Sequence, residues 1–267
     1  MRSLADVRGV ICDMDGVLWQ GASMLPGVHA ALSLLRGRGV PFVLATNNAT
    51  ITFEDIRRRL AAADVTIQPD DVYTSAQAAA AYLRDRYPAG SAVYAIGEAG
   101  LRMALASAGF HLTTGADGVV AVVAGLDRAL TWDRLTEAAV AIRHGAAFIG
   151  TNADATLPSE RGLVPGAGAL LAALETATGC TPTLIGKPEP HLFLHSLARL
   201  KTRPEETLVL GDRLETDILG GQRAGMWTGL LLTGVTDRRQ LAESSIRPDW
   251  VFEDLDDFRR ALGGEAD

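Results

Sequence analysis

The chain contains only two cysteines among its 267 residues, Cys12 and Cys180, and they form no CxxC pair. Two cysteines are too few for a disulfide framework. The chain is instead long enough to bury a sizeable hydrophobic core, as one large domain or two smaller ones. We expect Cys12 to be a small buried apolar residue and not a nucleophile, because strand alternation turns its side chain away from the neighbouring Asp13.

Long apolar runs are also missing. None approaches the length of a membrane span, and residues 1–8 hold no signal-peptide core, so a cytoplasmic protein without a membrane partner is expected. Positive charge is not in excess, and the net charge of −7 argues against nucleic-acid binding, because phosphate backbones attract basic surfaces. A small phosphorylated substrate is still compatible, since a few local cations and a metal can override the global sign.

The most informative feature that is present is a pair of carboxylates after the apolar run Val10–Cys12. Asp13 and Asp15 are two residues apart, so at strand spacing both point to the same side of the strand end. Gly16 then lets the chain turn sharply. Two acids on one side repel each other and need a cation or a shared proton, which suggests chemistry rather than packing.

Strand-like and helix-like patterns alternate along the chain. Helices are expected at 27–37, 52–63, 75–86, 99–108, 132–144, 167–178, 216–224 and 255–262, with Thr52 and Asp55 as an N-terminal cap of the second. Buried strands are expected at 7–12, 40–45, 92–96, 118–124, 147–149, 208–210 and 227–232, with shorter extended pieces at 72–73 and 184–185. Glycine and proline around Pro158 and Pro165 indicate a long loop. This alternation predicts an α/β protein with a doubly wound parallel sheet and helices on both faces.

Polar segments follow three more of these strands. They are Thr46–Asn48, Gly186–Pro188 and Gly211–Asp217. In open α/β sheets, ligands bind at the carboxyl ends of the strands, so four strand ends are expected to converge on one crevice.

The chemistry of that crevice fits a metal and a phosphoryl group. The acids Asp13, Asp15, Asp212 and Asp217 supply the hard oxygen ligands that Mg²⁺ prefers. Lysine, hydroxyl, amide and backbone donors suit phosphoryl oxygens, and a carboxylate held beside them is able to attack phosphorus and form an aspartyl-phosphate.

Together, four of these segments resemble the motifs of the haloacid dehalogenase (HAD) superfamily: Asp13–Val17, Thr46–Asn47, Lys187 and Gly211–Asp217. The longer strings Thr46–Thr50, Gly150–Asp154 and Gly211–Asp217 look like its class IIA branch with a C2-type cap. That branch includes NagD-like nucleotide phosphatases, 4-nitrophenylphosphatases, and phosphoglycolate or glycerol-phosphate phosphatases. The resemblance covers roughly residues 7–250. A DxDG run alone occurs in other sites, so the signal lies in all four motifs occurring in order, each after a strand.

The resemblance implies a role for each core residue. Asp13 matches the nucleophile, and Asp15 matches the general acid and base, which protonates the leaving alkoxide and then activates water. Mg²⁺ would be held by Asp13, by the backbone carbonyl of Asp15 and by Asp212. Lys187 would offset the charge between Asp13 and the phosphate.

Two further assignments have local alternatives. Thr46, Asn47 and Asn48 would hold the phosphoryl oxygens, although Thr46 also suits an ordinary helix cap. Asp217 either caps the next helix, where the helix dipole favours an acid, or supports metal-bound water or Lys187 from the outer shell.

The 139 residues between Asn47 and Lys187 exceed what one βα unit needs and predict an inserted domain. We expect a Rossmann-like HAD core at 1–88 plus 184–267 and an α/β cap at 89–183 that shuts the crevice from water and carries specificity. Within the cap, Asn152, Asp154 and Arg161 are candidate substrate contacts, or else simply loop-forming residues. The family resemblance also suggests a homodimer formed through the cap.

Two histidines on a predicted helix, His191 and His195, have the spacing of half a zinc site, but they lack an HExxH pattern and a third ligand. The sequence therefore predicts a Mg²⁺-dependent phosphatase that hydrolyses a small phosphorylated metabolite through an aspartyl-phosphate. The alternatives are a phosphotransferase on the same fold and a non-catalytic, phosphometabolite-binding regulatory protein. Asp15 favours hydrolysis, because superfamily members that do not hydrolyse phosphate often lack this residue.

Overall fold

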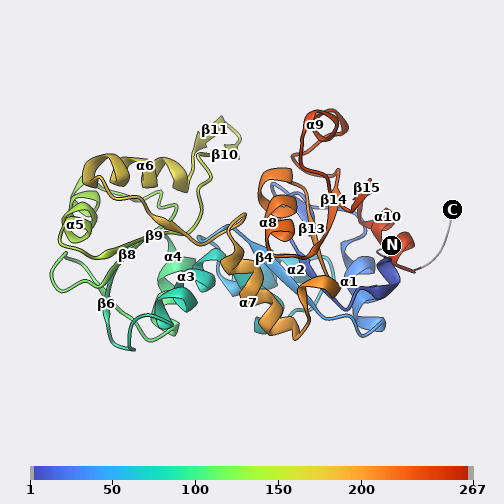
Figure 1. Ribbon diagram of the computed structural model, residues 1–267, viewed down its shortest axis with the longest axis horizontal. Coiled ribbons are helices and arrows are strands. Elements are labelled where there is room, and N and C mark those ends of the chain that lie inside the picture. Colours follow the sequence, from blue (N-terminus) through green and yellow to red (C-terminus); the bar gives the residue numbers. More distant parts are fainter. Residues whose placement is uncertain (1–2, 264–267) are drawn as a thin grey trace. The chain divides into compact units, whose positions relative to one another are not determined.

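The computed structural model describes residues 3–263 and divides into two compact α/β units (Figure 1). The first unit is drawn from Met1–Thr46, Ile56–Tyr73 and Lys187–Asp267, and the second from Asn47–Asp55 and Thr74–Gly186. Each unit has its own sheet. Within the described part of the chain, the helices are too short or too polar to cross a membrane.

The sheet of the first unit has six strands in the order β15-β14-β13-β1-β4-β5. They are β1 (Gly9–Cys12), β4 (Phe42–Thr46), β5 (Val72–Thr74), β13 (Thr207–Gly211), β14 (Trp227–Leu231) and β15 (Trp250–Phe252). β1 lies between β13 and β4 and is parallel to both, with Cys12 in register with Leu210 and Leu44. The carboxyl ends of these three strands therefore meet at one edge of the sheet.

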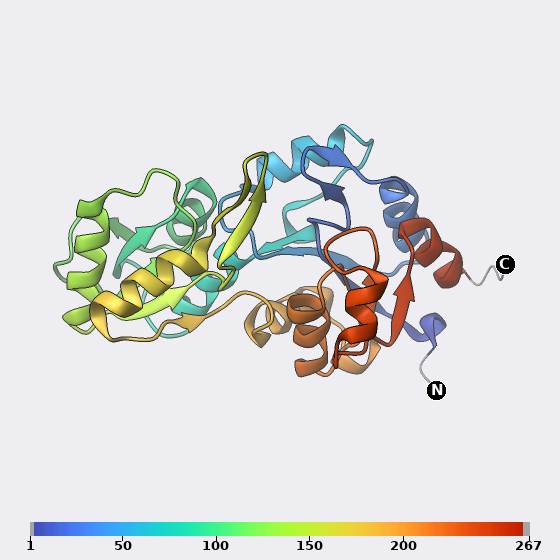
Figure 2. The same cartoon turned by 90° about the horizontal axis from the view of Figure 1, so that it is seen from above.

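Helices cover both faces of this sheet, as the buried apolar strands require (Figure 2). α1 packs against α10 on one face, and α7 packs on β1, β4 and α8 on the other. A small hairpin, β2 (Trp19–Gln20) and β3 (Ser23–Met24), follows β1. The helices are α1 (Val28–Gly37), α2 (Phe53–Ala61), α7 (Pro190–Leu200), α8 (Leu219–Arg223), α9 (Arg238–Glu243) and α10 (Leu255–Gly263), with a π-helical turn, Leu214–Ile218, before α8.

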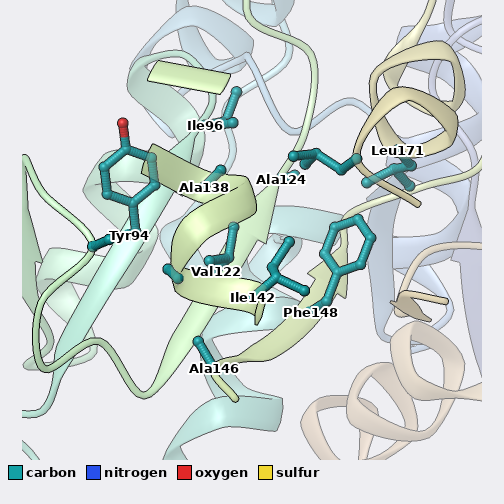
Figure 3. Close-up of a cluster of buried hydrophobic side chains, with 12 residues drawn as sticks. Tyr94, Ile96, Val122, Ala124, Ala138, Ile142, Ala146, Phe148 and Leu171 are labelled. Carbon is teal, nitrogen blue, oxygen red and sulfur yellow. The ribbon is translucent and has the colours of Figure 1, made fainter. Parts of the chain in front are cut away.

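The second unit has a five-stranded parallel sheet in the order β12-β9-β8-β6-β7. Its helices pack in pairs, α3 with α4 and α5 with α6. Its core lies beneath α5 and α6, where side chains such as Tyr94, Val122 and Phe148 pack together (Figure 3). The elements are β6 (Ala92–Ile96), β7 (His111–Thr113), β8 (Ala121–Ala124), β9 (Ala147–Gly150), β12 (Thr183–Leu184), α3 (Ser75–Arg84), α4 (Ala99–Ser107), α5 (Trp132–Arg143) and α6 (Ala167–Thr178), together with a hairpin of β10 (Thr156–Ser159) and β11 (Gly162–Pro165).

The predicted fold class is confirmed, and most of the longer elements begin and end within a few residues of their expected bounds. The cap of α2 is as expected, because the Asp55 N–H donates to Thr52 Oγ1 (3.2 Å) and the Thr52 N–H donates to the Asp55 carboxylate (3.1 Å). The long loop predicted around Pro158 and Pro165 is wrong. Both prolines lie in the antiparallel hairpin β10–β11, where the lack of neighbouring strands makes a missing N–H tolerable.

The boundary between the units also differs from the expected division. α3 groups with the second unit, although the division at residue 88 placed this helix in the core. The reason is its packing against α4, a contact that the alternation of strands and helices does not reveal.

Candidate active site

Three strands of the first unit deliver acidic or hydroxyl side chains to the same edge of its sheet. Asp13 follows β1, Thr46 ends β4 and Asp212 follows β13, and all three side chains are buried. The backbone N–H of Asp13 continues the sheet pairing and donates to the carbonyl of Leu210 (2.8 Å). The pairing of the central strands thus fixes the backbone position from which the side chain of Asp13 extends.

The ammonium of Lys187 is buried at this edge and reaches acceptors on three other residues. It contacts Asp13 Oδ1, donates to Asp217 Oδ1 (2.7 Å) and donates to the carbonyl of Ala45 (3.2 Å). All three N–H bonds of the ammonium are therefore used. Burial alone disfavours its charge, but the two carboxylates outweigh that effect and hold the pKa of Lys187 above its ordinary value. The lysine is a fixed positive charge at working pH.

One lysine does not balance the acids around it. Burial raises the pKa of Asp13, Lys187 opposes that rise, and the nearby Asp217 and Asp212 add to it. Burial, together with Asp217, also raises the pKa of Asp212 to about 6. Asp13 and Asp212 are thus held at positions where neighbouring negative charges repel their own. Binding a further cation at this edge would reduce that repulsion.

The carboxylate of Asp212 is held on one side only. Its Oδ2 accepts the backbone N–H of Val235 (2.7 Å), whereas its buried Oδ1 has no hydrogen-bond partner among residues 3–263. Gly16 and Gly234 pack against it so closely that a Cβ would lie 2.2 and 1.9 Å, respectively, from Oδ2. Gly16 also has a φ of +85°, which L side chains rarely adopt. These contacts leave Oδ1 as an unused ligand atom.

The carboxylate oxygens of Asp13, Asp212 and Asp217 lie within 4.8 Å of one another. Asp217 is also fixed by the N–H of Arg213, which donates to its Oδ2 (3.1 Å), in addition to its contact with Lys187. Three carboxylates with one ammonium and an unpaired oxygen fit a divalent cation that prefers hard oxygen ligands. The residues of the first unit are thus able to hold such an ion.

Asp15 differs from these acids. Its side chain is exposed, it is not part of the three-acid cluster, and its Oδ1 accepts the indole N–H of Trp19 (2.8 Å). Cys12 is buried and donates its thiol to the carbonyl of Asp13 (3.2 Å), and burial raises the pKa of the thiol. The expectation that Cys12 is an inert buried residue is confirmed.

The remaining candidates belong to the second unit. The carbonyl of Asn47 accepts hydrogen bonds from Ser75 Oγ (2.7 Å) and Asn152 Nδ2 (2.9 Å). Asn152 Oδ1 in turn accepts the N–H of Asp154 (3.1 Å), which is the local turn contact that loop residues make.

Asn48 makes a similar turn contact, since its Oδ1 accepts the N–H and the hydroxyl of Thr50. Arg161 is exposed in the turn between β10 and β11.

Comparisons with known proteins place these features in a family. Residues 10–111 match the family described as haloacid dehalogenase-like hydrolase, and residues 184–258 match a HAD-hydrolase-like family. The chain is 36% identical to the 5′-nucleotidase YutF of Bacillus subtilis over 251 residues, which is 94% of this chain and 97% of the relative. The chain belongs to the haloacid dehalogenase-like hydrolases.

Solved structures of related hydrolases have the same fold. A 4-nitrophenylphosphatase of Thermotoga maritima matches with a TM-score of 0.91 at 32% identity and covers 98% of this chain and all of its own. A glycerol phosphate phosphatase of Mycobacterium tuberculosis, solved in complex with magnesium, matches with a TM-score of 0.88 at 37% identity. That match covers 98% of this hydrolase and 78% of the other chain. The predicted resemblance to the class IIA branch is thereby confirmed.

Sequence reasoning missed three residues of this hydrolase that shape the site: Trp19, Gly234 and Val235. The signal for the last two was available, because Thr233–Val235 follows the predicted strand 227–232. The rule that strand carboxyl ends bind ligands applies to that strand as well. The contact of Trp19 with Asp15 has no such signal, because it depends on a short hairpin that the sequence pattern did not predict.

Proposed function

We propose that this hydrolase is a phosphatase that releases inorganic phosphate from a small phosphomonoester through an aspartyl-phosphate on Asp13. The observation that carries the proposal is the buried ammonium of Lys187, which bridges Asp13 and Asp217 beside the unpaired oxygen of Asp212. A nucleophilic carboxylate beside a fixed positive charge is suited to attack a phosphate dianion. The activities named for the relatives, on nucleotides, glycerol phosphate and 4-nitrophenyl phosphate, support the same class of reaction.

In this mechanism, the residues of the first unit act in two steps. An oxygen of Asp13 attacks phosphorus, the phosphorus–ester bond breaks, and Asp15 gives its proton to the leaving alkoxide. Water then attacks the phosphorus of the aspartyl-phosphate, loses a proton to Asp15, and releases phosphate and the free Asp13. Lys187 offsets negative charge during both steps. Thr46 and the adjoining Asn47 and Asn48 would donate hydrogen bonds to the phosphoryl oxygens.

The donor set also fits Mg²⁺. We infer that Asp13, Asp212 and the backbone carbonyl of Asp15 hold the ion, with Asp217 in its outer shell next to Lys187. When bound, Mg²⁺ supplies positive charge to the transferring phosphoryl group. The three clustered carboxylates and the magnesium-bound relative support this assignment.

The second unit would then act as the cap. We propose that it excludes water during the reaction and that Asn152, Asp154 and Arg161 contact the part of the substrate beyond the phosphate. The insertion of this unit between Thr46 and Lys187, both at the sheet edge of the first unit, supports the proposal. We also propose that the protein is cytoplasmic and forms a homodimer through the cap.

Phosphate release tests the proposed function. Wild-type protein is assayed with and without Mg²⁺ on 4-nitrophenyl phosphate, nucleoside monophosphates, glycerol phosphates, phosphoglycolate, sugar phosphates and pyridoxal phosphate. We expect Mg²⁺-dependent turnover that Asp13→Asn lowers by about 10³-fold or more, because the variant lacks the nucleophile. Asp70→Asn, the same change at an exposed position of the first unit, serves as the control and keeps full activity.

Each other outcome contradicts part of the proposal. Metal-independent release, or an active Asp13→Asn variant, rules out the mechanism. Transfer of phosphate to an added alcohol in preference to water identifies a phosphotransferase. Tight binding of one compound without turnover identifies a regulatory protein.

A further inference from the structure

The carboxylate of Asp15 is held by a residue that the mechanism above does not use. Its Oδ1 accepts the indole N–H of Trp19 at 2.8 Å. We propose that Trp19, backed by Arg59, is a positioning residue that orients the carboxyl group of Asp15 for proton transfer. This inference rests on the proposed function, in which Asp15 is the general acid and base.

The backbone places Trp19 and Asp15 on one closed turn. The N–H of Gly16 donates to the carbonyl of Trp19 (2.7 Å), and the N–H of Trp19 donates to the carbonyl of Met14 (3.2 Å). Trp19 is only 1% exposed, although Asp15 itself is exposed. A buried indole cannot swing away from the turn, so its N–H marks a fixed point for the more exposed carboxylate.

The contact also influences which oxygen of Asp15 carries the proton. An indole N–H is a donor only, so Oδ1 remains an acceptor in both the charged and the protonated form of Asp15. A carboxyl C=O oxygen is a better acceptor than its O–H oxygen, so the contact favours a proton on Oδ2 when Asp15 is protonated. With Oδ1 fixed by the indole, Asp15 is able to give and take a proton at Oδ2 repeatedly without rotating.

Arg59 of α2 holds the other side of the indole ring. Its guanidinium carbon lies 4.1 Å from the centre of the Trp19 ring, and its Nη2 contacts the carbonyl of Gly21 in the β2–β3 turn. Arginine stays charged in proteins, so this is a cation–π contact that adds to the fixation of the ring. Burial lowers the pKa of Arg59, and the nearby charge of Asp15 opposes part of that lowering.

The proton transfers that this geometry serves are balanced within the proposed mechanism. In the first step, the proton on Asp15 Oδ2 moves to the bridging ester oxygen as the phosphorus–oxygen bond breaks and the bond from Asp13 to phosphorus forms. In the second, a proton of the attacking water moves to Oδ2 as the aspartyl-phosphate bond breaks. Trp19 keeps its own proton throughout.

The leaving group provides the test, because alkoxides need a proton and 4-nitrophenolate does not. Trp19→Phe removes the N–H and keeps most of the ring. Single-turnover rates of Asp13 phosphorylation are measured in the presence of Mg²⁺ with a glycerol phosphate and with 4-nitrophenyl phosphate. Since general acid catalysis is worth about 10²- to 10⁴-fold, we expect the alkyl ester to slow about 10- to 100-fold, the aryl ester less than about threefold, and KM to stay constant.

Controls separate positioning from a structural defect. Trp227→Phe removes another buried indole, at the start of β14 and thus at the opposite end of that strand from the site, and is expected to leave both rates unchanged. Melting temperatures are measured for each variant. If Trp19→Phe does not fold, Arg59→Met replaces it, and a smaller shift in the same direction is expected because the ring loses its cation but keeps its N–H.

A double-mutant comparison gives the sharpest outcome. If Trp19 acts through Asp15, Trp19→Phe has no further effect on the alkyl ester in an Asp15→Asn background. Equal slowing of both esters, or additive effects in the double mutant, overturns the inference while leaving the proposed function intact. Absence of turnover in the wild-type protein instead overturns the proposed function.

Discussion

The two units share one architecture but treat the charges at their strand ends differently. In the second unit, Asp127 pairs with Arg134 (2.8 Å) and also accepts the N–H groups of Gly97 and Ala129, and Glu98 pairs with Arg128 (2.8 Å). Each of these acids has an arginine of its own. In the first unit, the ammonium of Lys187 pairs with both Asp13 and Asp217, and Asp212 lies in the same cluster of carboxylates.

This difference teaches where the chemistry resides. Two parallel sheets covered by helices are equally able to place acids at their carboxyl ends, so the fold alone does not choose between them. The surplus of buried negative charge distinguishes the first unit, because it raises the pKa values of Asp13 and Asp212 and favours the binding of a cation. The paired acids of the second unit create no such surplus.

The largest effect is expected from removing the shared cation. Lys187→Met leaves Asp13 and Asp217 without their ammonium, and kcat for phosphate release should fall by about 10²- to 10³-fold, as for the loss of one preorganised donor. The matched change in the second unit, Arg134→Met, removes the partner of Asp127 and should leave kcat unchanged. Steady-state kinetics on both variants measure the two values of kcat. A similar loss of kcat in both variants would contradict the contrast between the units.

A smaller effect is expected from the glycine against Asp212. Gly234→Ala places a Cβ 1.9 Å from Asp212 Oδ2 and so displaces the carboxylate. We expect the Kd for Mg²⁺, measured by calorimetry, to rise about 10- to 100-fold, as for other changes to groups that orient metal ligands.

The matched change in the second unit is Gly125→Ala, whose Cβ would lie 2.7 Å from Thr151 Oγ1. It should lower the melting temperature and leave the Kd unchanged. A weakened Mg²⁺ affinity in Gly125→Ala would mean that overall stability, and not the position of Asp212, sets the Kd.

The smallest effect is a pH dependence of stability in the metal-free protein. Because folding raises the pKa of Asp212 from 3.8 to about 6, the folded state binds more protons than the unfolded state between these values. The stabilisation that proton binding to Asp212 gives the folded state is fully present below pH 3.8 and is lost as pH rises through 6. Asp212→Asn should therefore stabilise the metal-free protein at pH 7.5, by about 1–3 kcal/mol, and much less at pH 4.5.

Urea unfolding in the presence of a chelator measures this difference. Asp127→Asn, which replaces an acid that already has a partner, should destabilise the protein instead. A change in the free energy of unfolding with the same sign in the two variants at pH 7.5 would contradict the contrast between the units.

Much of this organisation could be predicted from the sequence. Buried strands and long helices were found because their periodicity is strong, and the first-unit cluster was found because Asp13, Lys187, Asp212 and Asp217 each follow a recognisable strand or motif. The rule that parallel strands end at one edge then predicts that these residues lie together.

What could not be predicted depends on contacts without a sequence period. The hairpin β10–β11 lies where the sequence predicts a loop, because Pro158 and Pro165 indicate breaks in any longer element. The assignment of α3 to the second unit follows from helix packing, and the contact between Trp19 and Asp15 follows from a hairpin of two-residue strands. Such short elements carry too few residues to form a pattern.

The central position of β1 has a consequence for synthesis on the ribosome. β1 is the first strand to emerge, and it pairs with β4 about 30 residues later, but its other neighbour, β13, begins only at Thr207. A nascent chain therefore carries Asp13 through nearly 200 residues of translation with one side of its strand unpaired. When β13 finally closes the sheet and brings Asp212 and Asp217 close, Lys187 has already left the ribosome ahead of them, so the repelling carboxylates never gather without their counter-ion.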